Sequence, residues 1–360
     1  MPVKVYVLPA DAYGCGFYRL IWPAVVLQSQ GHDVEIMAPS KTSGFRAATT
    51  LNNDGEEVLT SVEIPQDADA VVVQRPAHPL QPQMINILRS NGIAVIVDMD
   101  DDMSCIHPEN SAFHMYRHRS STAFSWRYAG LSCRIASMVT VSTPQLAKVY
   151  GGHGRVRVLD NYVPAEAVGT PHLPTGAFGW AGTTKSHPND PQVTGHMAQK
   201  LISEGYTFQV VGGDPLVKNA FRMQFPPLMT GSVKFADWIP TLATAMDVGW
   251  APLASTAFNS SKSRLKPLEY MAAGVTWVGS PRAEYRKLHR EAGCGFLAET
   301  PKQWYNWTKT LLGNESLRQE QVEAGYAYLQ DQTYEANAWR WAEAWTDAIT
   351  AERKRVGLNL

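Results

Sequence analysis

The chain has 360 residues, a formal net charge of −1, 44% hydrophobic residues and 18% charged residues. This composition is typical of a globular protein with room for two domains of ordinary size, and it excludes a disordered chain. A net charge near zero also excludes a general attraction to nucleic acid, so any contact with a polyanion must depend on a local basic patch.

The four cysteines lie far apart and form no C-x-x-C pair. We therefore expect free thiols in a reducing compartment and no zinc site. The N-terminus runs directly into a strand-like segment, which leaves no room for a signal peptide, and no apolar run approaches the roughly 18 residues of a membrane span. We expect a cytoplasmic protein without a membrane span. None of these features predicts an oligomeric state.

Short apolar runs alternate with helix-length segments along the whole chain. In the first half the predicted strands are Val3–Leu8, Val34–Ala38, Ala70–Val73, Ala94–Asp98, Met138–Val141 and Val156–Leu159. In the second half they are Ala177–Ala181, Phe208–Val211, Val233–Phe235, Val248–Ala251, Val275–Gly279 and Gly295–Ala298. Apolar strands that alternate with helices indicate parallel sheets covered on both faces. The predicted fold class is α/β, with two doubly wound, Rossmann-like domains.

A segment rich in Pro and Gly, residues 161–176, separates the two halves. We place an N-terminal domain at residues 1–165 and a C-terminal domain at residues 166–339. The tail predicts a helix, and its last part, about residues 340–360, is a candidate to pack back on the N-terminal domain. Ligands of such sheets bind beyond the carboxyl ends of the strands, so two facing domains predict a site in the cleft between them.

The segment from Asn259 to Gly274 carries the strongest chemical signal. It predicts a polar loop and then a helix that begins near Lys266 or Pro267, since Pro is tolerated only in the first turn. Gly274 is the natural end of this helix. A buried strand, Val275–Gly279, is predicted to follow directly.

Three cations, Lys262, Arg264 and Lys266, stand at the start of this helix, and Glu269 lies about one turn inside. Cations and unpaired backbone N–H groups suit a diphosphate, and a carboxylate suits ribose hydroxyls. The segment therefore indicates a nucleotide-diphosphate site. The alternative interpretation is a solvated basic loop in front of a packing helix.

This segment resembles the nucleotide-sugar-binding motif of GT-B glycosyltransferases, particularly the retaining, family-4-like group. The resemblance implies a GT-B fold, a nucleoside-diphosphate-sugar donor with a UDP-sugar favoured, and no required cofactor. The glutamate that matches Glu269 binds the donor ribose in that family. A second family glutamate is replaced here by Ser261, which makes Lys262 a candidate for part of its work and for a catalytic role. The other residues assigned to the donor in this segment are Ser263, Arg264 and Lys266.

Two further segments of the second half fit the same resemblance. Lys185 follows the first strand of that half and resembles the family's cation on the donor diphosphate; the alternative is an ordinary surface lysine. Trp238 follows the predicted strand Val233–Phe235, where the nucleobase pocket is expected. It is predicted either to stack on the base or to pack in the interior.

The loop after the first strand contains Gly14, Gly16 and Arg19. Two glycines at a strand-to-helix turn let the backbone approach a phosphate closely. The dinucleotide fingerprint is excluded, because Arg19 stands where its third glycine is required. In GT-B enzymes the corresponding loop faces the donor phosphates, so the resemblance assigns these three residues to the donor.

An aspartate run, residues 98–102, follows the fourth strand of the first half. Such a run is costly unless it is solvated, bound to metal or placed near cations. We assign Asp100 and His107 catalytic roles, and Asp101 and His114 to the acceptor. For the histidines the resemblance implies this, since a histidine in this part of the fold often contacts the donor sugar or the acceptor in that family; the alternative for each is a surface or helix-packing residue. The run contains the D-x-D motif of the GT-A class, so a divalent metal is the rival mechanism. We disfavour it because the basic loop already supplies cations for the diphosphate.

The glycine loop and the aspartate run resemble glycosyltransferases encoded in bacteriophage and bacterial genomes. That resemblance implies an acceptor among hydroxymethylated DNA bases, proteins, lipids and small glycans, and the host cytoplasm as location if the gene is a phage gene. Residues 115–134 interleave cations and aromatic rings, as a DNA acceptor requires, and we assign Arg117 and Arg119 to it. The alternatives are an amphipathic surface helix for this segment and, for the protein, a non-catalytic nucleotide-sugar-binding function.

Overall fold

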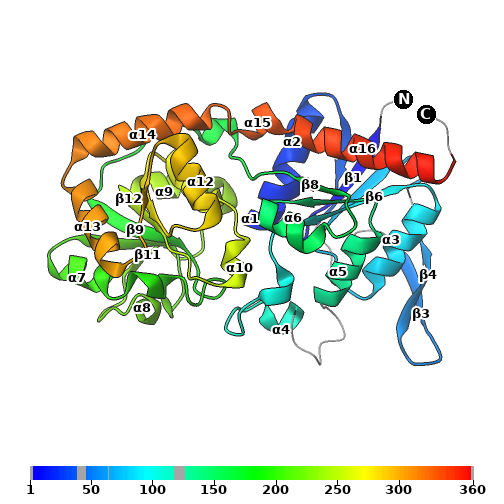
Figure 1. The fold of residues 1–360 in the computed structure, drawn as a ribbon, viewed down its shortest axis with the longest axis horizontal. Helices are drawn as coiled ribbons and strands as arrows, with labels where there is room; N and C mark the ends of the chain where they lie inside the picture. The colour runs from blue at the N-terminus through cyan, green and yellow to red at the C-terminus, as the bar shows by residue number, and fades with distance from the viewer. Residues whose placement is uncertain (1–2, 39–45, 64, 117–125, 358–360) are drawn as a thin grey trace. The chain divides into compact units, whose positions relative to one another are not determined.

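The computed structural model describes residues 3–38, 46–63, 65–116 and 126–357. The chain divides into two compact units, each built on its own parallel sheet (Figure 1). Unit 1 comprises the residues up to 106, residues 112–161 and the residues from 334 onward. Unit 2 comprises residues 107–111 and 162–333. The chain therefore passes from one unit to the other four times.

The sheet of unit 1 confirms all six strands predicted for the first half. Its strands are β1 (Lys4–Leu8), β2 (Asp33–Ile36), β5 (Ala70–Gln74), β6 (Ala94–Met99), β7 (Met138–Val141) and β8 (Val156–Val158). They are parallel, in the order β2-β1-β5-β6-β7-β8. The chain steps from β1 to β2 on one side and places β5 on the other. The point where the strand order reverses therefore lies between β1 and β5.

Helices cover both faces of this sheet (Figure 1). The helical segments of unit 1 are α1 (Gly14–Gly16), the π-helical η1 (Phe17–Ile21), α2 (Trp22–Ser29), α3 (Leu80–Ser90), η2 (Met103–Cys105), α4 (Phe113–Tyr116), α5 (Trp126–Ile135), α6 (Pro144–Tyr150), α15 (Tyr334–Asn337) and α16 (Trp339–Arg355). Helix α16 packs on α2 and on β5, β6 and β7, whereas α3 packs on α5 and β6. A hairpin that the sequence did not predict, β3 (Ala47–Leu51) and β4 (Glu57–Val62), packs on α3.

The predicted tail helix is present, but it is divided into α15 and α16. Trp341 and Trp345 lie one turn apart, and both are buried in unit 1. The indole nitrogen of Trp341 donates to the carbonyl of Arg19 at 3.1 Å. Glu352 pairs with Arg89 at 2.9 Å. The C-terminal segment is thus part of the core of unit 1.

A buried ion pair joins the first helical segment of unit 1 to the middle of its sheet. The guanidinium of Arg19 donates to both carboxylate oxygens of Asp98, at 3.0 and 2.8 Å, and Arg19 is only 1% exposed. Thr140 donates to the same carboxylate at 2.7 Å. The remaining nitrogen of Arg19 donates to the carbonyl of Leu159 and to the side chain of Asn161. Both charges are therefore paired, as burial requires.

The sheet of unit 2 has the same plan. Its strands are β9 (Ala177–Gly182), β10 (Thr207–Gly212), β11 (Leu228–Met229), β12 (Val248–Ala251), β13 (Thr276–Gly279) and β14 (Phe296–Leu297), in the order β11-β10-β9-β12-β13-β14. The strand order reverses between β9 and β12. The strand predicted at Val233–Phe235 is wrong: the edge strand is β11, and residues 235–237 form the 3-10 helix η5. A short alternating apolar run fits a helical turn as well as a strand, and here Val233 packs on the core from just before that turn.

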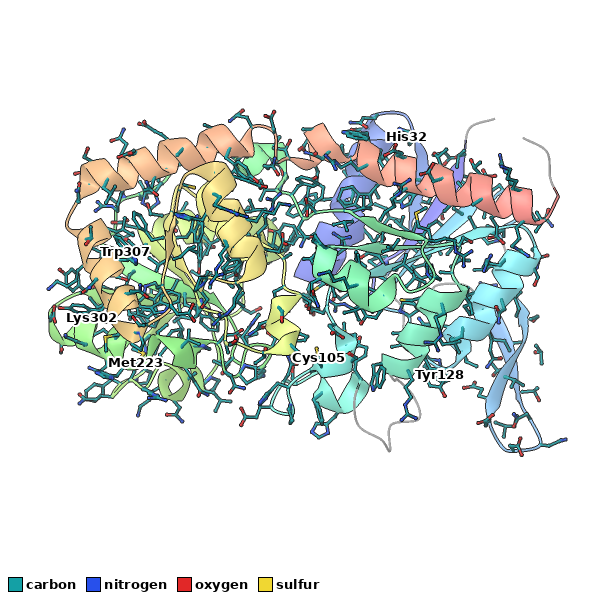
Figure 2. All side chains as sticks on the ribbon, viewed as in Figure 1. His32, Cys105, Tyr128, Met223, Lys302 and Trp307 are labelled. Carbon is teal, nitrogen blue, oxygen red and sulfur yellow. The ribbon has the colours of Figure 1, made fainter. Side chains whose placement is uncertain are left out.

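Unit 2 is likewise covered on both faces. Its other helical segments are η3 (Ala165–Ala167), η4 (Pro191–Thr194), α7 (Met197–Ser203), α8 (Val217–Ala220), α9 (Trp238–Ala245), α10 (Ala257–Ser260), α11 (Leu265–Ala272), α12 (Ala283–Ala292), α13 (Pro301–Leu312) and α14 (Glu315–Leu329). Helix α13 packs on α7, and α11 packs on α9 and α14. Trp307 of α13, labelled in Figure 2, stacks on Phe296 with ring centroids 4.6 Å apart. The predicted α/β class with two doubly wound domains is confirmed.

All four cysteines are free thiols, as predicted. In the part of the chain that the structure describes, no helix is both long and apolar enough to cross a membrane.

The Arg19–Asp98 pair yields a test of what holds unit 1 together. Asp98→Asn is expected to lower the free energy of unfolding by about 3–5 kcal/mol, because it leaves a buried guanidinium without its counter-charge. The double variant Arg19→Met with Asp98→Leu is expected to recover part of that loss. Urea unfolding followed by tryptophan fluorescence measures both; a double variant less stable than Asp98→Asn would contradict the explanation.

Candidate functional site

Strands β9 and β12 are held apart at their carboxyl ends by one tyrosine. They pair as far as Trp180 and Trp250. Beyond that point the hydroxyl of Tyr270 accepts from the backbone N–H of Ala181 at 3.0 Å and donates to the carbonyl of Trp250 at 2.9 Å. Gly249 makes room for the ring, because a Cβ there would lie 2.8 Å from it. A crevice site at a strand-order reversal needs this kind of separation.

Helix α11 supplies Tyr270 and, from the same helix, two of the residues predicted to bind the donor. Its limits confirm the prediction: it begins at Leu265 and stops before Gly274, which has a φ of +69°. Lys266 lies one turn before Tyr270 on the same face, and its ammonium donates to the carbonyl of Ala181. Burial lowers the pKa of Lys266, and the carboxylate of Glu269 offsets part of that shift. Glu269 itself is 7% exposed.

The loop that follows β9, residues 183–190, is fixed at its first end by Asp214. This carboxylate accepts from the hydroxyl of Thr183 at 2.7 Å, and from the backbone N–H and hydroxyl of Thr184 at 2.7 and 2.6 Å. Burial opposes ionisation of Asp214, but these hydrogen bonds outweigh it and hold its pKa below the usual value. The loop is thereby tied to the segment that follows β10.

Asp190 fixes the other end of the loop. Its Oδ1 accepts from the backbone N–H of Ala254 at 2.8 Å and from the amide of Asn259 at 2.5 Å. Its Oδ2 lies 2.8 Å from Nδ1 of His187. Burial opposes ionisation of Asp190, but its hydrogen bonds, led by that of His187, hold its pKa below the usual value. The loops after β9 and β12 are therefore joined across the strand-order reversal.

His187 and Asp190 were not selected from the sequence, although the H-x-x-D spacing in a loop after a strand is a usable signal. Burial lowers the pKa of His187, and Asp190 opposes that shift. The ammonium groups of Lys262 and Lys266 lower it further. These three basic groups therefore interact electrostatically at the carboxyl end of β9.

The other donor residues predicted in the basic loop take different positions. Lys262 is half-buried, with its ammonium 4.4 Å from the ring centroid of Phe258, and Ser263 beside it is half-buried. Ser261, where the resemblance leads one to expect a glutamate, is fully buried and donates to the carbonyl of Phe258 at 2.7 Å. The structure thus brings Lys262 together with Lys266, while Ser261 closes the end of α10.

Arg264 serves as an anchor for α11. Its guanidinium donates to Glu291 of α12 at 2.8 Å, to the hydroxyl of Tyr328 at 2.8 Å and to Gln332 at 3.0 Å. Arg264 is 4% exposed. Its charge is therefore directed to side chains of α12 and α14 and to Gln332.

Two more of the predicted donor residues lie on this unit. Lys185 is exposed on the loop after β9. Trp238 begins α9, is half-buried and packs against the hydrophobic core. No strand leads into it, so the sequence argument that placed it at the end of a strand does not hold.

His107 belongs to unit 2, although most of the surrounding sequence belongs to unit 1. It opens a short segment that packs on the loop after β9. The backbone N–H of Ser111 donates to the carbonyl of Lys185 at 2.8 Å, and the amide of Asn110 donates to the carbonyl of Ser186 at 2.9 Å. The segment that carries His107 is therefore fixed to the loop that carries His187.

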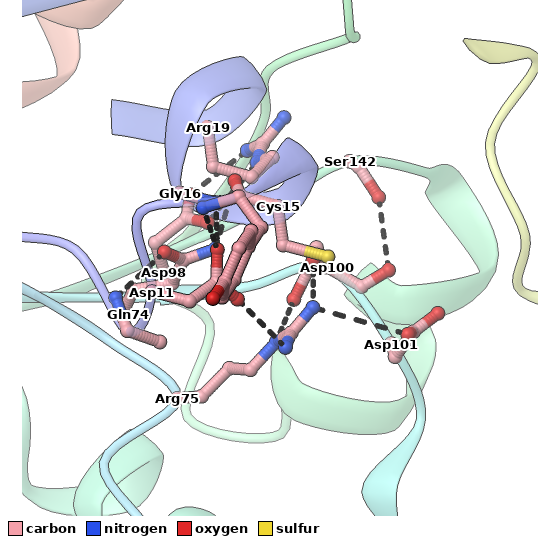
Figure 3. Close-up of polar contacts among 12 residues, drawn as sticks. Asp11, Cys15, Gly16, Arg19, Gln74, Arg75, Asp98, Asp100, Asp101 and Ser142 are labelled. Carbon is pink, nitrogen blue, oxygen red and sulfur yellow. Dashed lines mark hydrogen bonds and ion pairs between the residues drawn. The ribbon is translucent and has the colours of Figure 1, made fainter. Parts of the chain in front are cut away.

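The strand-order reversal of unit 1 is lined by the glycine loop (Figure 3). Asp11 accepts from the backbone N–H groups of Tyr13 and Gly16 at 3.0 and 2.9 Å. A Cβ at Gly16 would lie 1.9 Å from the carbonyl oxygen of Asp11, whereas Gly14 has open space around it. Glycine is therefore required at position 16 because the backbone of Asp11 comes so close to it. Its N–H group already donates to the carboxylate of Asp11.

Arg75, which was not selected from the sequence, organises the carboxylates at this point (Figure 3). It lies in the left-handed region with a φ of +49° and forms a bidentate pair with Asp100. Its guanidinium is also 3.8 Å from Asp11 and 4.0 Å from Asp101. Burial raises the pKa of the neighbouring Cys15 thiol to about 12. The predicted residues Asp100 and Asp101 thus lie together, facing a cation of their own unit.

The remaining predictions in unit 1 have separate outcomes. Arg19, predicted to reach the donor phosphates, instead directs its guanidinium to Asp98 in the interior, where both charges are dry and paired. His114 is exposed on α4. Arg117 and Arg119 lie outside the described residues. Within the described ranges, no group of three or more His, Cys, Asp or Glu side chains is arranged to hold a metal ion.

The role of Tyr270 can be tested directly. Tyr270→Phe is expected to lower the free energy of unfolding by about 1–3 kcal/mol, because it leaves the N–H of Ala181 and the carbonyl of Trp250 without their partner. Tyr305→Phe is the matched control, since the Tyr305 hydroxyl binds Glu204 on the surface. Equal urea midpoints for Tyr270→Phe and the wild type would show that the hydroxyl does not hold the strands.

No protein-family model matches the chain, and no curated protein sequence matches it. Solved structures match over nearly the whole chain. A glycosyltransferase from Rickettsia africae ESF-5 has a TM-score of 0.64 at 13% identity, covering 96% of this chain and 98% of that one. An alpha-glucosyltransferase in complex with UDP and a 13-mer DNA that contains a central A:G mismatch has a TM-score of 0.63 at 13% identity, covering 97% and 99%.

Sucrose-phosphate synthase from Thermosynechococcus elongatus has a TM-score of 0.61 at 12% identity, covering 97% of this chain and 100% of that one. At such identities the likeness concerns the fold. The chain has the GT-B fold with two Rossmann-like domains, as the resemblance of its basic motif implied.

Proposed function

We propose that the protein is a glycosyltransferase that moves a sugar from a nucleoside-diphosphate sugar, with a UDP-sugar favoured, to an acceptor hydroxyl. The observation that carries the proposal is the cluster at the strand-order reversal of unit 2. There Lys262 and Lys266 lie with the buried carboxylate of Glu269, at the edge where open α/β sheets bind ligands. The GT-B fold supports it, because UDP is bound by a protein of the same fold.

Each part of the cluster suits one part of the donor. The ammonium groups of Lys262 and Lys266 offset the charge of the diphosphate, with Ser263 and Lys185 as further donor contacts. Glu269 accepts from the ribose hydroxyls. A preorganised cation that meets charge as it develops contributes about 2–4 kcal/mol to the transition state, by analogy with oxyanion donors.

The reaction that we propose proceeds with retention. The bond between the anomeric carbon and the diphosphate oxygen breaks, and a bond to the acceptor oxygen forms on the same face of the sugar. The acceptor proton passes to the leaving diphosphate. The protein mainly positions the two substrates. We assign His107 to the reacting sugar, and Asp101 and His114 to the acceptor.

We propose a hydroxymethylated DNA base as the first acceptor to examine. The similar alpha-glucosyltransferase in complex with UDP and DNA supports this choice. Arg127 and Arg134 of α5 belong to the basic, aromatic segment expected to meet DNA. Proteins, lipids and small glycans are the other acceptor classes, and a nucleotide-sugar-binding protein without turnover is the other class of function.

The activity can be tested with UDP-glucose and duplex DNA that contains hydroxymethylated bases. We expect DNA that gains the mass of a hexose, an α-linkage by NMR, and activity that survives EDTA. Lys262→Met and Lys266→Met are each expected to lower kcat by about 10²–10³-fold. Transfer to protein, lipid or glycan but not to DNA would contradict only the proposed acceptor. A β-linkage would contradict only the proposed retention of configuration. Binding of the nucleotide sugar, with neither hydrolysis nor transfer to any acceptor, would contradict the proposal that the protein is an enzyme.

The ribose contact has its own test. Glu269→Gln is expected to weaken UDP binding about 10- to 100-fold, because a charged hydrogen bond to the ribose hydroxyls is lost. Isothermal titration calorimetry measures the dissociation constant. A UDP analogue that lacks both ribose hydroxyls is the control, and it should bind the wild type and the variant equally. An unchanged affinity for UDP would remove Glu269 from the site.

A further inference from the structure

The loop after β9 presents one imidazole whose orientation is fixed and whose outer nitrogen is available. Nδ1 of His187 lies 2.8 Å from Asp190, and the side chain is 21% exposed. Among the residues that the structure describes, Nε2 of His187 has no hydrogen-bond partner. Because the carboxylate accepts at Nδ1, that nitrogen carries a proton, and Nε2 is left to gain or lose one.

The support of this imidazole is rigid. Asp190 is 3% exposed and is also bonded to Ala254 and Asn259, so it cannot turn away from His187 without breaking those bonds. Asp214 holds the opposite end of the loop through Thr183 and Thr184. A side chain held in this way loses little freedom when a ligand binds.

The charges that face His187 are mainly positive. Lys262 and Lys266, from the α10–α11 segment, both disfavour its protonation, and burial disfavours it more. Asp190 is the opposing charge on its own loop. Glu269 acts on Lys266. The neighbouring segment, which carries His107 and Glu109, is bonded to the loop by Asn110 and Ser111.

Like charges gathered at one point repel one another, and an anion at that point relieves the repulsion. We propose that His187 is a ligand of the donor diphosphate, that Asp190 is its positioning residue, and that Nε2 takes up a proton from solvent when the diphosphate binds. The proton then forms a charge-assisted hydrogen bond to a phosphate oxygen. This inference rests on the proposed function, since it assumes that the cluster binds a nucleoside diphosphate.

The sign of the pH effect follows from linkage. The pKa of His187 lies below its usual value in the unliganded protein, and a bound diphosphate raises it. Between the unliganded and liganded pKa values, binding takes up a proton, so UDP affinity falls as pH rises through that window. The fall is at most about tenfold per pH unit for one proton.

Isothermal titration of UDP in PIPES, HEPES and Tris at one pH gives the number of protons taken up. We expect the wild-type protein to take up a proton when UDP binds. In His187→Gln the protein should take up none, because the glutamine amide donates a hydrogen bond but does not titrate. Comparison of the two proteins at each pH also cancels the titration of UDP itself. Asp190→Asn is expected to reduce the uptake, and its thermal midpoint reports whether unit 2 remains folded.

His196→Gln is the matched control, because His196 is exposed at the start of α7. It should keep the proton uptake of the wild type. Equal uptake in wild type and His187→Gln, or UDP binding without uptake between pH 5.5 and 8.5, would overturn the role of His187 and leave the glycosyltransferase proposal intact. An absence of UDP binding throughout this range would overturn both.

Discussion

The candidate site of unit 2 depends on the hydroxyl of Tyr270, which stands between two strands where their pairing ends. It bonds to Ala181 of β9 and to Trp250 of β12, and Gly249 gives its ring the space. Because Tyr270 belongs to α11, the same contact fixes that helix along its axis. Lys266, one turn earlier, is thereby brought to the end of β9. Separation of the strands and placement of the basic residues are consequences of one interaction.

The two strand-order reversals have the same topology and opposite chemistry. In unit 2, Lys262 and Lys266 act on one another beside carboxylates that are already bonded within the fold. In unit 1, Arg75 faces Asp100 and Asp101, and its own pairing with Asp100 is bidentate. A doubly wound sheet offers a crevice in either case. The side chains at the crevice decide whether it suits an anion, which is why we propose unit 2 as the site of the diphosphate.

Carboxylates at the site of unit 2 act mainly as structural supports. Asp190 and Asp214 each accept several hydrogen bonds from the chain, so the loop between them is held at both ends before any ligand arrives. Bonds made in advance do not have to form during binding or catalysis, which is the advantage of a preorganised electrostatic site. The buried pair of Arg19 and Asp98 does comparable work in unit 1, where it joins a helical segment to the sheet.

The sequence by itself determined most strands of the two parallel sheets, since a buried parallel strand requires an almost continuous apolar run. It missed the exposed β3–β4 hairpin, and it failed at Val233–Phe235, where a run of three residues fits a helical turn equally well. It also determined the limits of α11, because Pro267 is tolerated only in a first turn and Gly274 ends the helix. The positive charge of the loop before α11 could also be predicted from the sequence. Only the tertiary structure decided which cations remain at the site. Arg19, Arg264 and Lys262 are all cations that the sequence predicted to bind the donor. The fold buries Arg19 and Arg264 in ion pairs. The partners in these ion pairs come from distant segments of the chain, so a local sequence pattern does not predict them.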